Sequence, residues 1–410
     1  SNGVKVIIKK TDFKADEIVF DAQALGGTSV FPDSYANSLI SFPVMIEQSG
    51  LGDYTAKDMQ KYLQGKQLRV SPSFDAYVRD VAGTTTPKDL PTAMELIYMT
   101  FTNFNITPDE FLASQKQYEG LLKNQEANPE YIFQRDLTKA LFTNPRKQAL
   151  SAEAIEGATL EQTLEIARKM TANAADYTFF FAGNIDMATF RPLVEQYIAT
   201  LPADASKATK KPQFVESLNI APGDKETVFT TEMQQPQTYV AILNYGKLPY
   251  TKENRAAASV AGQILSKRLL DKVREEMGAV YSIWASGNME RVTDKNNTMM
   301  QSTFPMKPEL RKEVLDVIAK EFKDMETNVT PEELGKVVEF MIKNVTENQK
   351  LNSAWINAMA GEALNGVDTF HGAEEMYKAM TPADIQKYMK ELNKQGNYRV
   401  ILLEPAAKAE

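Results

Sequence analysis

The segments NITPDEF (residues 105–111) and NVTPEEL (residues 328–334) share one pattern and lie 223 residues apart. In each of them a threonine that can accept a hydrogen bond from first-turn amides precedes a proline, which fits the first position of a helix. The glutamate three residues after the threonine, Glu110 or Glu333, can reach back to the threonine amide. Both segments therefore predict the start of a helix, and their recurrence predicts a duplicated domain.

Two further pairs of segments recur at nearly the same spacing. TLEQ returns as TPAD after 222 residues, and YTFFF returns as YRVIL after 221 residues. In each copy a helical pattern precedes an apolar run rich in aromatic or β-branched residues, which predicts a helix and then a strand. The predicted elements are long helices at 109–126 and 332–349, shorter helices at 159–171 and 381–392, and strands at 177–182 and 398–403.

Each copy also begins with a predicted strand that leads into a helix, at 16–25 and 35–49 in the first copy and at 238–243 and 253–277 in the second. Because helices and strands mix without strict βαβ alternation, the pattern predicts the α+β class. We expect two tandem homologous two-layer domains, each a mainly antiparallel sheet covered by helices. Their predicted bounds are 1–205 and 206–410, with a proline- and lysine-containing linker at about 202–225.

The composition excludes several classes of function. Of the 410 residues, 43% are hydrophobic and 24% are charged, which is typical of a globular protein with more than one core. The net charge of −8 and the scattered lysines argue against nucleic acid as a partner, and no apolar stretch approaches the roughly 20 residues that insert across a membrane. The absence of cysteine excludes disulfides and thiolate chemistry. Because the chain lacks an initiator methionine and soon reaches a strand-like run, we interpret it as an excerpt of a longer protein.

The candidate site lies where the predicted helix 253–277 gives way to an alternating pattern. Gly278 should end the helix, which places Arg274 in its last turn and Tyr281 early in the next strand. A guanidinium and a phenol together offer hydrogen-bond donors for a peptide carbonyl or a developing oxyanion. The structural alternative is that Arg274 complements the helix dipole and that Tyr281 packs at the start of a strand. Spacing alone favours this structural alternative.

The segment VREEMGAVYS (residues 273–282) resembles the arginine–tyrosine signature of pitrilysin- and insulysin-type zinc peptidases, the inverzincins. The resemblance extends over nearly all of 4–405 through the duplication. In that family four similar α+β domains form two halves that close around an unfolded peptide. The first domain holds zinc in an H-x-x-E-H motif, and the arginine–tyrosine pair comes from the last domain.

The resemblance implies that this chain is the second, non-zinc half, or a separately encoded partner subunit, of such a peptidase. Its expected partners are the N-terminal H-x-x-E-H half, which would hold the zinc, and a peptide substrate. Tyr281 is expected to hydrogen-bond the substrate carbonyl and the transition state, and Arg274 to bind substrate. The chain alone is expected to hold no cofactor and to be inactive, and a periplasmic or secreted location is favoured over a cytoplasmic one.

The first copy departs from the family's catalytic half. The metal motif should fall in SFPVMIEQSG (residues 41–50), where Ser41, Val44 and Met45 occupy the His, Glu and His positions. Serine and methionine are poor zinc ligands, and valine cannot take a proton. The chain's one histidine, His371, lies in a loop-like stretch, and we interpret it as a surface or loop-packing residue.

Two other functions remain open from the sequence. The chain could be a non-catalytic structural or binding subunit that retains the duplicated fold, as the core subunits of respiratory complexes do in the wider family. It could also be a free-standing hydrolase with a site of its own.

Overall fold

The computed structural model describes residues 2–209, 211, 220–290, 293 and 295–406, and the chain forms two compact units. Unit 1 comprises Ser1–Asn124, Asn144–Leu218 and Glu347–Gly366, and unit 2 comprises Gln125–Thr143, Asn219–Thr346 and Val367–Glu410. Each unit thus includes one short segment from the other half of the sequence. The predicted linker at 202–225 lies in part outside the described residues.

Unit 1 is built on a five-stranded sheet in the order β1-β7-β2-β5-β4, in which only the β1–β7 pair is parallel. Ile18, Phe20 and Ala22 alternate along β2 and face a core shared with helix α3. The strands are β1 Lys5–Lys10, β2 Ile18–Leu25, β4 Leu68–Phe74, β5 Val78–Thr85 and β7 Thr178–Gly183, with a separate pair β3 Gly50–Leu51 and β6 Phe104–Asn105. The helices are α1 Ala36–Met45, α2 Ala56–Tyr62, α3 Leu90–Thr102, α4 Pro108–Gln125, α6 Ala152–Glu156, α7 Leu160–Thr171, α8 Met187–Leu193 and α12 Asn352–Asn365.

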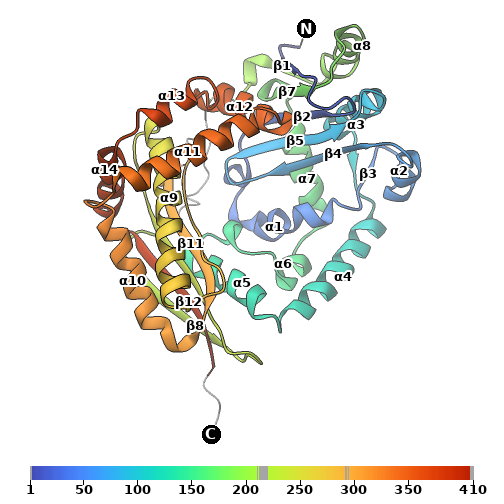
Figure 1. Cartoon of the computed structure of the whole chain (residues 1–410). Coiled ribbons are helices and arrows are strands. Elements are labelled where there is room, and N and C mark those ends of the chain that lie inside the picture. Colours follow the sequence, from blue (N-terminus) through green and yellow to red (C-terminus); the bar gives the residue numbers. More distant parts are fainter. Residues whose placement is uncertain (1, 210, 212–219, 291–292, 294, 407–410) are drawn as a thin grey trace. The chain divides into compact units, whose positions relative to one another are not determined.

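Unit 2 repeats this plan with the sheet order β10-β11-β9-β12-β8, in which only the β8–β12 pair is parallel. Its strands are β8 Lys225–Thr231, β9 Thr238–Gly246, β10 Ala285–Met289, β11 Thr298–Met306 and β12 Tyr398–Pro405. Its helices are α5 Pro129–Leu141, α9 Lys252–Leu269, α10 Arg311–Asp324, α11 Pro331–Asn348, α13 Ala373–Lys378 and α14 Pro382–Asn393 (Figure 1). The α+β class and the mainly antiparallel sheets are therefore confirmed.

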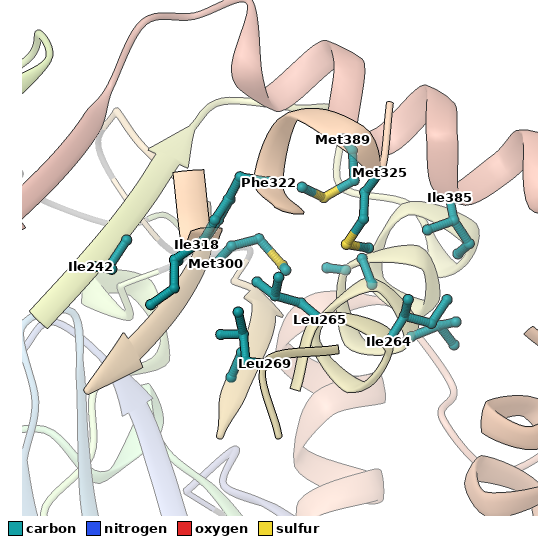
Figure 2. Packing of buried hydrophobic residues seen from close by; sticks show 14 of the residues in the cluster. Ile242, Ile264, Leu265, Leu269, Met300, Ile318, Phe322, Met325, Ile385 and Met389 are labelled. Atoms are coloured by element: carbon teal, nitrogen blue, oxygen red, sulfur yellow. The ribbon is translucent and has the colours of Figure 1, made fainter. Parts of the chain in front are cut away.

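The main core of unit 2 lies between one face of this sheet and helices α9, α10 and α14. Figure 2 shows Ile264 and Leu265 of α9 in one cluster with Met325, which follows α10, and Met389 of α14. All four side chains are buried from solvent. Helix α9 therefore lies in the middle of the core, and its C-terminal end leads to the predicted site.

The helix starts predicted from the repeat form as expected, with one difference between the copies. The Thr107 hydroxyl accepts from the Glu110 amide at 3.2 Å, and the Glu110 carboxylate accepts from the Thr107 amide at 3.0 Å. The Thr330 hydroxyl likewise accepts from the Glu333 amide at 3.1 Å. However, the Glu333 carboxylate accepts hydrogen bonds from the Arg268 guanidinium, and the prediction that it could reach back was wrong because this charged partner is available.

The two exchanged segments contain helices α5 and α12, and each covers the second face of the sheet in its unit. Ile132 and Phe133 of α5 pack with Leu243 and Ile401 in unit 2. In unit 1, Ile356 and Ala360 of α12 pack on Phe180 and Ala182 of β7. Both faces of each sheet are thus covered, which explains why the inner strands β7 and β12 are apolar on both sides.

Helix α9 approaches strand β10 closely enough that only glycine fits at the contact. A Cβ at Gly262 would lie 2.2 Å from the Gly287 amide nitrogen, and one at Gly287 would lie 2.0 Å from the Ala258 carbonyl oxygen. Ala257 and Ala261 on the same helix are also buried. This contact fixes the position of α9 relative to the strand that follows the candidate site.

We predict that Gly262→Ala lowers the free energy of unfolding by roughly 2 to 3 kcal/mol, because the added methyl group overlaps backbone that cannot move independently. The matched control is Gly335→Ala in helix α11, where nothing lies within 4 Å of the new Cβ. That change should stabilise the protein by about 1 kcal/mol, since alanine has the higher helix propensity. Urea unfolding followed by circular dichroism measures both, and equal effects would contradict the assigned contact.

Asp21 on β2 is a partly buried carboxyl on the sheet face opposite the Ile18 side. Its Oδ2 accepts from the Gln23 side-chain amide at 2.6 Å. Burial raises the pKa of Asp21 to about 7; the Gln23 hydrogen bond opposes this shift, and the nearby Asp80 carboxyl adds to it. In the folded protein this carboxyl therefore stays protonated at pH values at which an ordinary aspartate is ionised.

From this pKa we predict that the free energy of unfolding falls as pH rises from about 4 to about 7. Over that range the unfolded chain releases the Asp21 proton while the folded chain retains it, and the loss reaches roughly 2 to 4 kcal/mol above pH 7. Asp21→Asn should remove this decline, so the variant should exceed the parent in stability at pH 8 but not at pH 4. The exposed Asp12→Asn is the control, and urea midpoints that shift in parallel for both variants would contradict the prediction.

Candidate functional site at the end of helix α9

The helix that carries Arg274 widens before it ends. After α9 the chain continues as a π-helix over Leu270–Glu276, in which the Met277 amide donates to the Lys272 carbonyl five residues back at 3.1 Å. Gly278 then adopts a φ of +59°, and the Ala279 amide donates to the Val273 carbonyl at 3.1 Å. The predicted stop at Gly278 is confirmed, because a positive φ suits glycine best. Such π-turns are frequent at functional sites.

Arg274 lies on the exposed surface of this π-helix. Its side chain is 45% exposed, and its ion pair with the neighbouring Glu275 spans 3.6 Å. A pair of this length between exposed groups contributes little to stability. The guanidinium is therefore accessible to a ligand.

Tyr281 lies in the segment that connects Gly278 to strand β10, and not in the strand as predicted. Pairing with β11 begins only at Ala285, opposite Ser302. The expected alternation fails because Ala279 and Val280 are both buried, which a strand with one covered face does not allow. The Tyr281 side chain is 90% exposed, and its hydroxyl has no hydrogen-bond partner among the described residues.

The backbone beneath Tyr281 is nevertheless held firmly. The Lys307 amide donates to the Ala279 carbonyl at 3.1 Å, and Ala279, Val280 and Ile283 are all buried in the unit 2 core. Within the described part of the chain no hydrogen bond joins Arg274 to Tyr281, and the two residues lie on opposite sides of the Gly278 turn. Both side chains thus extend from a fixed backbone without engaging each other.

A buried ionic network anchors the π-helix to its neighbours. Glu321 of α10 is only 1% exposed, and its carboxylate accepts from Lys272 on the π-helix and from Arg268 on α9, the latter at 3.4 Å. Arg268 also binds Glu333 at 2.6 Å. The sequence does not reveal this network, because Glu321 and Glu333 are distant in sequence from Arg268 and Lys272, and charged residues on helices are usually solvated.

The positions that correspond to a metal motif do not fit a zinc ion. Ser41 and Met45 lie one turn apart on α1 and are fully buried, and Val44 between them is partly exposed. A hydroxyl and a thioether are poor zinc ligands, and valine offers no donor atom. Across the described residues, no group of three or more His, Cys, Asp or Glu side chains could hold a metal ion.

His371 lies on the surface in the segment before α13, with a side chain that is 78% exposed and paired with Asp368. This agrees with its interpretation as a surface residue. As for a membrane, no helix in the described ranges has both the length and the apolar composition needed to span one.

Residues 157–341, a range that includes both Arg274 and Tyr281, match the family described as "Peptidase M16 inactive domain". This part of the chain is similar to peptidase M16 inactive domains. The resemblance to the non-zinc half of the insulinase-type zinc peptidases is therefore confirmed.

Relatives of this M16 inactive domain are named as proteases. The chain is 20% identical to "Probable zinc protease PqqL" of Haemophilus influenzae over 291 residues, which cover 69% of the chain and 30% of that protein. The crystal structure of the periplasmic protease PqqL from Escherichia coli matches with a TM-score of 0.81 at 18% identity, covering 99% of the chain and 45% of that protein. The chain therefore spans less than half the length of both relatives.

A second solved structure matches the chain along its whole length. It is the peptidase M16 inactive domain from Pseudomonas fluorescens, with a TM-score of 0.81, 15% identity and coverage of 100% of this chain and 97% of that one. At these identities the likeness to solved structures establishes the fold.

We predict that Glu321→Ala destabilises the protein by about 2 kcal/mol, because it removes the buried carboxylate that Lys272 and Arg268 share and leaves Arg268 only its pairs with Glu333 and Asp324. The matched control is Glu332→Ala on α11, whose pair with Lys336 is exposed and should contribute less than about 1 kcal/mol. Chemical denaturation measures the difference between the two variants. If Glu321→Ala cost no more than Glu332→Ala, the anchoring role of the network would be wrong.

Proposed function

We propose that this chain is the non-zinc half of a two-part zinc endopeptidase that cleaves peptides in a closed chamber. The observation that carries the proposal is Tyr281, which lies inside the matched M16 range and is 90% exposed on a backbone held by buried neighbours. An exposed aromatic residue on a fixed backbone is suited to binding, since little conformational entropy remains to be lost. The names of the relatives as proteases agree with this reaction class.

On this proposal Tyr281 acts on the carbonyl of the bond to be cleaved. Its phenol donates a hydrogen bond to the carbonyl oxygen and to the oxyanion that replaces it during attack. The bond strengthens as negative charge develops, which is the requirement for lowering the barrier and not only for binding substrate. The chain supplies no nucleophile or general base in this scheme, and those belong to the H-x-x-E-H half.

Arg274 has a separate role in the proposed reaction. Its guanidinium carries five N–H donors and a fixed positive charge, which suit a backbone carbonyl or a carboxylate of the bound peptide. An interaction made equally in the ground state and the transition state changes the KM more than the kcat. We therefore assign Arg274 to substrate binding.

The first repeat would form chamber wall on this proposal. Ser41 and Met45 are buried in α1, so the former metal positions contribute to packing. We retain 1–205 and 206–410 as the bounds of the two repeats. The protein would pair with an H-x-x-E-H half, fused or separate. It would reside in the periplasm or outside the cell, since the similar PqqL of Escherichia coli is a periplasmic protease.

We predict that the chain alone does not cleave peptides even with added zinc, and that mixing it with its H-x-x-E-H half produces activity. In the mixture Tyr281→Phe should lower kcat by roughly 10²-fold, the effect of losing one oxyanion donor. Arg274→Ala should raise the KM by about tenfold with a smaller change in kcat. Steady-state kinetics with a quenched fluorescent peptide measures these values.

The control for these variants is Tyr54→Phe in unit 1, an exposed tyrosine that should leave the kinetics unchanged. If Tyr281→Phe and Arg274→Ala both retained full activity, the assigned roles would be incorrect. If a folded complex of the two halves formed but cleaved nothing, the chain would instead be a structural or binding subunit that retains the duplicated fold. Zinc-independent cleavage by the chain alone would indicate a separate hydrolase site.

A further inference from the structure

Trp284 is a second exposed aromatic residue in the segment that carries Tyr281. Its side chain is 50% exposed, whereas Ile283 and Ala285 on either side of it are 5% and 3% exposed. It immediately precedes strand β10 and lies three residues after Tyr281. The indole is therefore exposed to solvent at a position whose two neighbouring residues are both buried in the core.

The backbone of Trp284 is fixed by the neighbouring strand. The Ser302 hydroxyl on β11 donates to the Trp284 carbonyl at 2.6 Å, and the ladder between β10 and β11 begins at the next residue. The Gly262–Gly287 contact holds the same strand against α9. The outward direction of the indole thus results from an ordered backbone.

The chain's other tryptophan shows how a structural indole is accommodated in this protein. Trp355 is partly buried on α12, its Nε1 donates to the Gln349 carbonyl at 2.9 Å, and the Lys9 ammonium lies 3.9 Å from its ring centroid. Within the described residues, the Trp284 Nε1 has no hydrogen-bond partner, and no cation lies over its ring. Trp284 thus retains an apolar ring face and an N–H donor that the folded chain does not use.

We propose that Trp284 is a specificity-determining residue that contacts a large apolar side chain of the extended peptide bound by Tyr281. This inference rests on the proposed function. Three residues of chain reach at most roughly 10 Å, about the span of three residues in an extended peptide. The contacted side chain therefore lies within about three residues of the cleaved bond.

An apolar partner fits the exposed indole of Trp284 better than an acidic one. The indole offers a broad ring face whose contact with an apolar side chain removes water from both. A basic side chain could interact with the ring face through its charge, which the experiment separates from apolar contact.

The test uses the full chain carrying Trp355→Phe, in which Trp284 is the only tryptophan. Three fluorescein-labelled peptides of Gly, Ser and Ala differ only in one central residue, which is Phe, Lys or Glu. Anisotropy gives the Kd of each peptide, and unlabelled versions are followed by the emission of Trp284. We expect the Phe peptide to bind about tenfold more tightly than the Glu peptide and to shift the emission to shorter wavelength.

Two variants assign the preference to the indole. Trp284→Ala should bind the Phe and Glu peptides with nearly equal Kd, whereas Trp284→Phe should retain most of the preference because it keeps an aromatic face. Phe340→Ala, which removes an exposed aromatic residue on α11, is the control and should leave the preference intact. Circular dichroism confirms that each variant is folded.

Several outcomes would overturn the inference: equal binding of the three peptides, binding of none, tightest binding of the Lys peptide, or a preference that survives Trp284→Ala. These results are distinct from failure of the proposed function, which is judged by cleavage in the reconstituted complex. If Tyr281→Phe left cleavage intact while Trp284→Ala abolished the preference for Phe, the catalytic role of Tyr281 would be refuted and the recognition role of Trp284 would be supported.

Discussion

The inner strands β7 and β12 are apolar on both faces, and this constraint determines how each unit is built. Both faces of such a sheet must be covered by other elements. Helices from the same repeat cover only one of the two faces. In unit 1 the side chains of Phe179 and Phe181 face the main core, while Phe180 packs under α12. In unit 2 the corresponding second face is covered by α5. Burial of these faces therefore determines which parts of the sequence belong to each unit.

The candidate site follows from the same packing in unit 2. Helix α9 must lie close to β10 to complete the core, and the Gly262–Gly287 contact allows this approach. The helix then widens into a π-helix, ends at Gly278 and leads into a short segment with buried Ala279, Val280 and Ile283. The exposed side chains of Arg274 and Tyr281 thus extend from a backbone that the core holds in place. This arrangement is suited to recognition and contributes little to folding stability.

Local sequence signals predicted the features that depend on local chemistry. The reciprocal cap of Thr107 and Glu110 and the stop at Gly278 follow from backbone requirements that a few neighbouring residues satisfy. The duplication was visible because both copies keep the same helix starts. The candidate site was located from the motif around Arg274 and Tyr281, whose functional roles remain predictions.

Features that depend on distant residues were not predictable in this way. Glu333 binds Arg268 and not its own helix start, because the energetically better partner comes from another helix. Tyr281 was expected in a strand, since alternation over a few residues cannot reveal that two successive neighbours are buried. The exchange of α5 and α12 was also hidden, because an amphipathic helix does not specify which sheet it covers.

That exchange has a consequence for synthesis of the protein. Unit 1 includes Glu347–Gly366, so the second face of its sheet is covered only after these residues, which follow most of unit 2 in the sequence, have left the ribosome. Domains made of one continuous segment fold in order from the N-terminus as they emerge. Here unit 1 must wait for a helix encoded well after the rest of that unit, with Phe180 and Ala182 exposed in the meantime. Unit 1 therefore completes its folding only after most of unit 2 has been synthesised.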